Sequence, residues 1–406
     1  MLANLSRWRS SRRRSPQTEA RPSVAFLMEY VPAYRAPIYE HLAPLLEAEG
    51  IELILCVGTP PPSRSARQDA LVPANAVFNR NRFVSVRGRE LTFQWLPRAA
   101  TTADLVVVQQ EAGLVINYLL AARSVLGRRF AVWGHGEDPN AITRSDGVER
   151  LKRVVTRRAH WAFAYTDRSR QIFESIGVPA DRVTVTNNSM SIDTSFDPRD
   201  VDPELRELVA EVERRSRRIG WFVSSMDEGK RLPDLMKIVD QVRNEIHDFE
   251  FFFVGEGGAR PEVTEFCRDR PWAHDVGARR DAEKAAIGSV ARLMIMPSAV
   301  GLHVLDAFAF GSPLITATDP SNSHELDYLD DDVNGVLLRH GAANEDFALA
   351  AVGLLNDEVR HDAMCEAAQH SAEEFSIEAM TARFAAGIAL ALRPETRTRT
   401  SESARG

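Results

Sequence analysis

Short apolar runs alternate along the chain with longer segments in which apolar residues recur every three or four positions. In the first half, the apolar runs predict strands at residues 23–30, 51–58, 104–110, 129–136, 161–166 and 182–188. The periodic segments between several of these runs predict helices at residues 38–50, 114–127, 148–159 and 169–177. Alternation of strand and helix is typical of a parallel sheet that is covered by helices on both faces.

The alternation stops at residues 199–218, a charged segment with few large apolar side chains, and then begins again. The second half predicts strands at residues 219–225, 249–255, 293–298 and 313–318, and helices at residues 234–246, 261–269 and 302–311. We therefore expect an N-terminal domain over residues 23–198, a linker over 199–218 and a C-terminal domain over 219–375.

The two ends of the chain differ from the domains. Residues 376–392 predict a last amphipathic helix, whose return to the N-terminal domain stays open. Residues 1–22 are rich in arginine and residues 393–406 are polar, and we expect a disordered basic arm and a disordered tail. The predicted fold class is α/β, with two Rossmann-like, doubly wound domains that face each other across a cleft. Ligands bind at the carboxyl ends of the strands in such folds.

Composition narrows the class of protein. The chain has 406 residues, of which 44% are hydrophobic and 26% charged, as in globular proteins. Its net charge of −7 gives no basic field for nucleic acid, so we expect no nucleic-acid partner. The three cysteines form no C-x-x-C spacing, and no run approaches the roughly 18 apolar residues that span a bilayer. We expect a cytoplasmic protein; weak attraction of the basic arm to the inner face of a membrane is the less favoured alternative to disorder.

Residues 293–335 carry the most informative motif. A buried strand leads into Pro297 and Ser298, and Gly301 permits a tight turn before a helix that begins near Leu302. A strand, loop and helix in this order point free N–H groups at one place, which suits a phosphate, although an ordinary turn between a strand and a helix fits equally well. Asp306, one helical turn further on, suits the hydroxyls of a ribose or is a solvated helix charge.

This segment resembles the C-terminal half of the GT-B glycosyltransferases, specifically the retaining GT4 family, also called glycosyl transferases group 1. The residues in matching places are Pro297, Gly301, Leu302, Asp306, Ala307, Ala309, Gly311, Pro313, Leu314 and Ile315. The family's acid-x7-acid motif is altered, because Ser298 stands where its first acid is expected and Ser225 replaces the family's arginine five positions before the lysine. The resemblance covers nearly all of residues 23–392 and implies a variant active site.

The resemblance also implies roles on the donor side of the cleft. Lys230 would hold the donor diphosphate, and Arg231 and Arg279 or Arg280 are candidates to replace the missing arginine. Ser298, Gly301, Leu302 and Asp306 would line the donor site, with Asp306 on the ribose. His324 and Glu325 resemble, more loosely, the family's acidic residue that closes over the nucleotide.

On the acceptor side, the resemblance places His135 near the reaction centre and Tyr34 and Arg35 at the acceptor mouth. A lone histidine is usually structural, but Gly134 and Gly136 on either side of His135 allow a ligand to approach the backbone closely. His135 and Lys230 are therefore the predicted catalytic residues.

The implied function is transfer of a sugar from a nucleotide-diphosphate sugar to a glycan or lipid-linked acceptor, with retention, in cell-surface polysaccharide biosynthesis. No metal or other cofactor is expected. Two alternatives stay open: a non-catalytic nucleotide-sugar-binding protein, because of the altered motif, and a nucleotide-sugar epimerase of the same fold. A nicotinamide dehydrogenase and a P-loop NTPase are disfavoured, since the GEGG run at 255–258 lacks a third glycine at Arg260 and no GxxxxGK[ST] is present.

Overall fold

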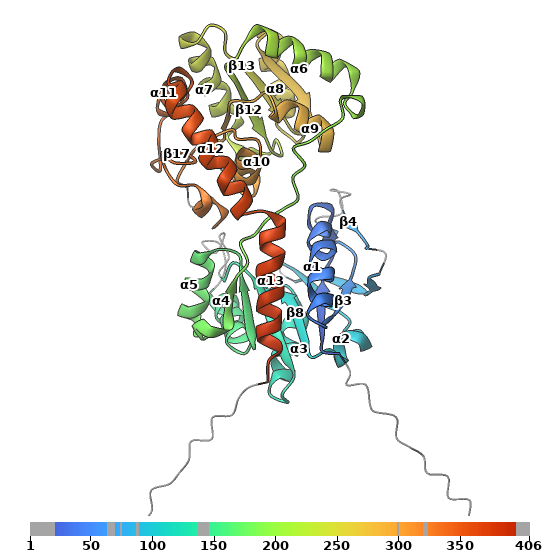
Figure 1. Ribbon diagram of the computed structural model, residues 1–406. Coiled ribbons are helices and arrows are strands. Elements are labelled where there is room, and N and C mark those ends of the chain that lie inside the picture. Colours follow the sequence, from blue (N-terminus) through green and yellow to red (C-terminus); the bar gives the residue numbers. More distant parts are fainter. Residues whose placement is uncertain are drawn as a thin grey trace, which may run out of the picture.

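The computed structural model describes residues 21–62, 70–73, 75–86, 89–136, 146–298, 300–319 and 324–394. They form two α/β domains stacked one above the other, with the last helix of the chain running back down into the N-terminal domain (Figure 1). Both domains are built on a parallel sheet with helices around it, so the predicted fold class is confirmed. Most of the basic arm and of the tail lies outside the described residues.

The N-terminal domain is built on a seven-stranded parallel sheet in the order β11-β10-β9-β8-β1-β3-β5. Its strands are β1 (Ser23–Met28), β3 (Glu52–Val57), β5 (Val77–Phe78), β8 (Leu105–Gln109), β9 (Arg129–Gly134), β10 (Trp161–Ala164) and β11 (Val183–Val185). Its helices are η1 (Ala33–Arg35), α1 (Ala36–Ala48), α2 (Arg98–Thr102), α3 (Val115–Ser124), α4 (Asp146–Arg157), α5 (Asp167–Ile176) and η4 (Ala180–Arg182).

The central strand β1 shows why the apolar runs predict buried strands. Val24, Phe26 and Met28 belong to one hydrophobic cluster and Ala25 and Leu27 to another. Because successive side chains of a strand point to opposite faces, these clusters lie on the two sides of the sheet. A strand covered on both faces needs apolar residues at every position.

Two small antiparallel sheets lie beside the main one, and the sequence pattern predicts neither. They pair β2 (Val31–Pro32) with β4 (Ala70–Leu71), and β6 (Asn81–Val86) with β7 (Arg89–Gln94). The strands β2 and β4 have only two residues each, and β6 and β7 mix polar and apolar residues. None of them has the continuous apolar run by which a buried strand is recognised in a sequence.

The C-terminal domain is built on a six-stranded parallel sheet in the order β14-β13-β12-β15-β16-β17. Its strands are β12 (Ile219–Val223), β13 (Glu250–Val254), β14 (Ala273–Gly277), β15 (Leu293–Ile295), β16 (Leu314–Ala317) and β17 (Gly335–Leu338). Its helices are α6 (Pro203–Arg215), η6 (Glu228–Lys230), α7 (Leu232–Glu245), α8 (Arg260–Arg268), α9 (Asp281–Gly288), α10 (His303–Ala309), η7 (His324–Tyr328), α11 (Asn344–Asn356) and α12 (Glu358–Glu374).

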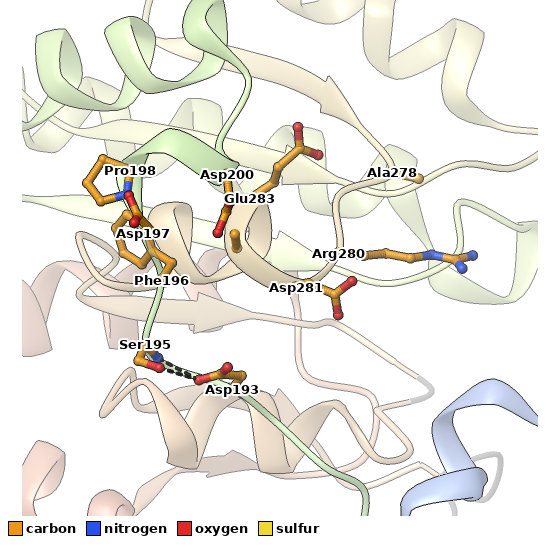
Figure 2. A pocket seen from close by; sticks show the side chains of 11 residues that line it. Asp193, Ser195, Phe196, Asp197, Pro198, Asp200, Ala278, Arg280, Asp281 and Glu283 are labelled. Atoms are coloured by element: carbon orange, nitrogen blue, oxygen red, sulfur yellow. Dashed lines mark hydrogen bonds between the residues drawn. The ribbon is translucent and has the colours of Figure 1, made fainter.

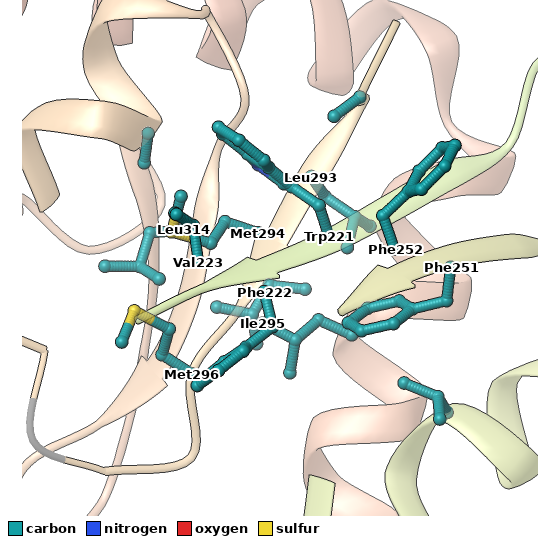
Figure 3. Packing of buried hydrophobic residues seen from close by; sticks show 14 of the residues in the cluster. Trp221, Phe222, Val223, Phe251, Phe252, Leu293, Met294, Ile295, Met296 and Leu314 are labelled. Carbon is teal, nitrogen blue, oxygen red and sulfur yellow. The ribbon is translucent and has the colours of Figure 1, made fainter. Parts of the chain in front are cut away.

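Aromatic and aliphatic side chains fill the space between this sheet and its helices. Trp221 and Phe222 on β12 and Phe251 and Phe252 on β13 are fully buried, and their neighbours on β15 pack against them (Figure 3). The indole Nε1 of Trp221 donates to Ser312 Oγ at 3.0 Å, so the polar atom of this core side chain is satisfied.

The segment predicted to be a linker contains a helix of the C-terminal domain. After η5 (Pro198–Asp200), α6 presents Leu205, Val209 and Val212 to the C-terminal core cluster. The aspartate before the helix, Asp202, caps it by accepting from the backbone N–H groups of Glu204 and Leu205, both at 3.1 Å. The connection between the domains is therefore the stretch before this helix.

Helix α13 (Ile377–Leu392) leaves the C-terminal domain and completes the core of the N-terminal one (Figure 1). Phe384 stacks on Phe163 of β10 with ring centroids 4.2 Å apart, and it belongs to the N-terminal core cluster. Glu358–Leu392, which comprises α12 and α13, is the one segment of the described chain that is long and apolar enough to cross a membrane. Met364 of α12 is buried in the C-terminal core and Phe384 of α13 in the N-terminal core, whereas Val359 and Leu390 of the same helices are exposed.

Candidate functional site

Strand order places one crevice in each domain. In the C-terminal sheet the order reverses between β12 and β15, and in the N-terminal sheet between β1 and β8. The loops after such neighbouring strands diverge to opposite faces of the sheet and leave a crevice at their carboxyl ends. Lys230 follows β12, Ser298 follows β15 and Arg35 follows β1, so three predicted site residues belong to loops at these crevices.

Lys230 and Arg231 lie in the connection from β12 to α7. Arg231 adopts a left-handed backbone conformation with φ of 51°, which ends η6 and turns the chain into α7. Its Nε donates to Asp234 Oδ2 at 2.8 Å and its Nη1 to Pro297 O at 3.4 Å. Burial lowers the pKa of Lys230, an effect that the nearby Asp227 carboxylate partly offsets.

The GEGG run at residues 255–258 packs against the start of this connection. A Cβ on Gly255 would lie 1.9 Å from the carbonyl oxygen of Ser224, which no side chain tolerates. The backbone N–H of Met226 donates to Glu256 O at 2.8 Å, so the two loops are joined along their backbones. The glycine at 255 thus serves close packing of loops, in accord with the absence of a dinucleotide fingerprint.

The loop after β15 contacts the loop of Lys230 directly. Ser298 is buried, and its Oγ donates to Gly229 O at 2.8 Å. Gly301 has φ of 59°, with open space where a Cβ would be, so the turn there is one that glycine adopts without strain. Leu302 follows and precedes α10. The structure therefore brings Ser298 and Lys230 into one neighbourhood.

Asp306 is buried and is already bound on both oxygens. Lys284 Nζ on α9 lies 2.7 Å from Oδ1, and His303 Nδ1 lies 2.9 Å from Oδ2. Burial raises the pKa of the Asp306 carboxyl, but Lys284 and His303 outweigh it, so that the pKa is below its usual value. The carboxylate thus ties α9 to α10, and its contact with a ribose stays a prediction.

His135 follows β9 at the carboxyl edge of the N-terminal sheet. The side chain of Gln110 binds both backbone polar groups of the next residue, Gly136. Gly136 N donates to Gln110 Oε1 at 2.8 Å, and Gln110 Nε2 donates to Gly136 O at 3.1 Å. The imidazole meets the ring of Tyr165 edge-on at 4.4 Å and that of His324 at 4.9 Å. His324 comes from the other domain, so His135 lies where the two domains meet.

The two predicted acceptor residues differ in exposure. Tyr34 is 43% exposed, whereas Arg35 is only 8% exposed. The guanidinium of Arg35 lies over the ring of Trp133 at 4.8 Å, and its Nη2 donates to Tyr165 Oη at 3.0 Å. Tyr165 therefore connects Arg35 to His135.

Glu325 lies on η7 of the C-terminal domain, and this helix contacts the N-terminal domain. Asn188 Nδ2 in the N-terminal domain donates to Glu325 Oε1 at 2.6 Å, and Ser169 Oγ lies 2.9 Å from His324 Nδ1. Burial, together with the nearby His135 and Arg168, lowers the pKa of His324 to about 4, so that this ring is neutral at pH 7. Glu325 thus contacts the opposite domain, and its contact with a nucleotide stays a prediction.

A cavity of about 1050 Å³ lies between the interdomain stretch and the β14–α9 connection (Figure 2). Its charged lining is one arginine and five carboxylates: Arg280, Asp193, Asp197, Asp200, Asp281 and Glu283. Of the predicted site residues only Arg280, a candidate to replace the missing arginine, lines it, and an acidic wall repels a diphosphate. We therefore place the candidate site at the switch points and not in this cavity.

No group of three His, Cys, Asp or Glu side chains that could hold a metal ion occurs in the described part of the chain. The carboxylates of Asp331 and Asp332 accept hydrogen bonds from the chain itself. Asp331 Oδ1 accepts from Leu337 N at 2.9 Å, and Asp332 Oδ1 accepts from Arg360 Nη2 at 2.6 Å.

Sequence reasoning did not single out several residues that complete the site. Lys284 and His303 bind Asp306, Tyr165 contacts the ring of His135 within the N-terminal domain, and Ser169 binds His324 across the domain boundary. Their partners are distant in sequence, and none belongs to a spacing that signals a site. The sequence offers a signal only for Tyr165, which directly follows the buried strand β10 and so is expected at the carboxyl edge of the sheet.

This fold and site define a class of protein. Two Rossmann-like domains with a cationic loop at the switch point of the second are the architecture of GT-B glycosyltransferases. The sequence model of the family described as "Glycosyl transferases group 1" matches residues 217–357, which include Lys230, Ser298, Asp306 and Glu325. Residues 217–357 are thus a glycosyl transferases group 1 domain.

Solved structures agree in fold, while no curated protein matches the sequence. Anabaena Alr3699/HepE, crystallised with UDP-glucose, has a TM-score of 0.63 at 14% identity over 91% of this chain and 99% of its own. The lipopolysaccharide outer core galactosyltransferase WaaB has a TM-score of 0.59 at 16% identity, over 90% of this chain and 99% of its own. A putative UDP-N-acetylglucosamine 2-epimerase from Listeria monocytogenes has a TM-score of 0.59 at 14% identity, over 86% and 91%. At these identities the likeness is one of fold.

Proposed function

We propose that this protein is a retaining glycosyltransferase that moves a sugar from a nucleotide-diphosphate sugar to a glycan or lipid-linked acceptor in cell-surface polysaccharide synthesis. The observation that carries the proposal is the loop pair of the group 1 domain, in which Ser298 Oγ binds Gly229 O beside Lys230 at the switch point. The UDP-glucose complex of HepE and the role printed for WaaB support the donor class and the biosynthetic setting.

In the proposed reaction, the bond between the anomeric carbon and the diphosphate oxygen breaks, and the acceptor oxygen bonds to that carbon. The acceptor's proton passes to the leaving diphosphate, so a glycoside and a nucleoside diphosphate result. Negative charge develops on the leaving group, and fixed cations stabilise it better than reorganising water does. Lys230 and Arg231 supply this charge, and the backbone at Gly301 and Leu302 lies in the loop beside them.

The remaining predicted residues take roles around this centre. His135 would contact the reacting sugar, and Tyr34 and Arg35 would receive the acceptor. Asp306 would bind the ribose once its contact with His303 opens, and Glu325 would close over the nucleotide. We propose that no metal is required and that the protein acts in the cytoplasm at the inner face of a membrane.

Replacing Lys230 tests the proposal. In Lys230→Ala, we expect turnover of the nucleotide sugar to fall on the order of 100-fold, the scale for one preorganised charge contact. Lys237→Ala is the matched control, because Lys237 is an exposed lysine on α7, next to the same loop. Unchanged turnover by folded Lys230→Ala would contradict the proposed role.

A nucleotide-sugar epimerase is the second candidate, favoured by the similar fold of the Listeria protein. Incubation with the nucleotide sugar alone separates the two. A transferase leaves the configuration of the unreacted donor unchanged, whereas an epimerised donor would establish the second candidate.

A further inference from the structure

Arg35 is a buried cation without an anionic partner. Its Nε and Nη1 are buried and donate to no acceptor among the described residues, and the guanidinium forms no ion pair with a described carboxylate. Only Nη2 is engaged, on the hydroxyl of Tyr165. A buried charge is costly unless it is paired, and the aromatic ring of Trp133 offsets only part of that cost.

Other buried donors lie around the same guanidinium. The indole Nε1 of Trp133 and the hydroxyl of Tyr39 are also buried without a hydrogen-bond partner in the described chain. Trp133 lies 4.8 Å below the guanidinium, and Tyr39 is one helical turn after Arg35 and interacts with it electrostatically. The group that satisfies such a set of donors must offer several acceptor oxygens and negative charge.

This cluster lies next to the predicted reaction centre at His135. Tyr165 binds Arg35 with its hydroxyl and touches His135 with its ring. The ring centroid of Tyr34, which is 43% exposed, lies 5.7 Å from the guanidinium carbon. A ligand that enters beside Tyr34 would reach both Arg35 and the neighbourhood of His135.

We propose that Arg35, with Tyr39 and Trp133, binds an oxyanion carried by the acceptor, so that the acceptor is a carboxylated or phosphorylated sugar. This inference rests on the proposed transferase function, which supplies the acceptor. A planar guanidinium binds either oxyanion through two parallel N–H groups, here the second N–H of Nη2 with that of Nε or Nη1, whereas a neutral sugar leaves the charge unpaired.

Calorimetry with small probes tests the site. The probes are glucuronic acid, glucose 1-phosphate and neutral glucose, and the protein is the full chain carrying Lys230→Met, which removes phosphate binding on the donor side. We expect at least one anionic probe to bind about tenfold or more tightly than glucose, a difference of about 1.4 kcal/mol. The two anionic probes distinguish a carboxylate acceptor from a phosphate acceptor.

Two variants assign the binding to this cluster. Arg35→Met keeps the volume and removes the charge, and should abolish the preference for the anion. Tyr39→Phe removes a hydroxyl that has no partner in the described chain, so it should leave folding unchanged and weaken the anion a few-fold. Equal binding of all three probes, or an anion preference that survives both changes, would overturn the inference.

UDP binding by the wild type, measured in parallel, separates the two claims. If no nucleotide and no nucleotide sugar binds, the proposed function itself is overturned. If UDP binds and neither anionic probe does, the oxyanion site alone is overturned.

A second, independent observation concerns the hairpin of β6 and β7, in which two polar side chains of β7 are turned inward. Thr92 and Gln94 are buried at 3% and 8% exposure, and Thr92 Oγ1 donates to Glu29. The register pairs Arg82 with Phe93 and Val84 with Leu91 on the opposite face. There Phe93 is 43% exposed, and Trp95, just beyond β7, is 77% exposed.

The charge around this hairpin indicates its partner. Arg80, Arg82 and Arg98 are exposed in and beside the hairpin, in a chain whose net charge is −7. An exposed tryptophan beside arginines suits the interface of an anionic membrane, and two such surfaces would repel each other in a dimer. We infer that the outer face of β6–β7 docks on an anionic lipid surface.

Co-sedimentation of the full chain with vesicles tests this surface. Vesicles that contain phosphatidylglycerol should bind the wild type, in a salt-sensitive way, and pure phosphatidylcholine should bind it weakly. Phe93→Ser/Trp95→Ser should reduce binding about tenfold. The matched control, Leu349→Ser/Val359→Ser, removes apolar residues of 69% and 83% exposure from the C-terminal domain. Undiminished binding by the hairpin variant, or loss of a dimer instead of lipid binding, would overturn the inference.

Discussion

Gly255 lies where two backbones approach so closely that no side chain fits. Its missing Cβ leaves room for the carbonyl oxygen of Ser224, at 1.9 Å from the ideal Cβ position. The loop of Lys230 rests on this contact through Met226, whose N–H donates to Glu256 O. The position of the predicted catalytic lysine thus depends on a residue that binds nothing itself.

We predict that Gly255→Ala lowers the free energy of unfolding by about 2 kcal/mol or more, because the added methyl forces the loops apart. Urea denaturation measures the change. Gly258→Ala is the control from the same run of glycines, since no described atom lies within 4 Å of the position that a Cβ would take there. Equal stability of the two variants would show that the loops separate without cost.

At the scale of elements, α13 is a C-terminal helix that serves the N-terminal core. Phe384 contacts Phe163, Trp133 and Phe26, whose ring centroids lie 4.2, 5.2 and 5.4 Å away. Arg129 Nη1 donates to Ala391 O at 3.1 Å and thereby holds the end of the helix. The N-terminal domain is therefore incomplete until the last helix has been added to it.

We predict that Phe384→Ala costs about 3–5 kcal/mol of stability, the range for removing a fully buried phenyl ring. Leu390→Ala is the control on the same helix, because Leu390 is 43% exposed. Urea unfolding followed by tryptophan fluorescence measures both. A loss in Phe384→Ala no greater than in the control would contradict the packing described for α13.

The sequence predicts the central strands and most helices correctly, because strands such as β1 and β12 are buried on both faces and carry continuous apolar runs. It does not predict β6 and β7, where the polar Thr92 and Gln94 are buried while the apolar Val86 and Phe93 are exposed. The pattern of α13 shows only that one face is apolar, not which domain covers it. The site is predicted in part: loops at strand ends locate Lys230, Ser298 and His135, but the pairing of Asp306 with Lys284 depends on tertiary packing.

At the scale of the whole molecule, η7 connects the domains at the predicted reaction centre. His324 touches Ser169 and His135, and Tyr328 Oη donates to Tyr165 O at 3.2 Å. The neutral state of His324 is part of this contact, because burial and neighbouring cations hold its pKa near 4. The packed interface between the domains therefore disfavours protonation of the His324 ring.

We predict that acid weakens this interface. The folded-state pKa of His324 is about 4, below its unfolded value of about 6.5, so the unfolded or separated state binds more protons between these values. The stabilising contribution is present above pH 6.5 and is lost as the pH falls towards 4. Hydrogen exchange of residues 324–328 should rise over this range, and His324→Asn should flatten the rise. An unchanged pH profile in His324→Asn would assign the effect to other groups.

The central claim is that the loops of Lys230 and Ser298 form a nucleotide-diphosphate site, and thermal unfolding with nucleotides tests it most directly. The wild type would be compared with Lys230→Ala in UDP, GDP, ADP and CMP. A ligand at 100 times its dissociation constant stabilises the folded state by about 2.7 kcal/mol. We predict a shift of the wild type with one nucleoside diphosphate and a smaller shift in the variant. No shift with any of these nucleotides, or equal shifts in both proteins, would contradict the account.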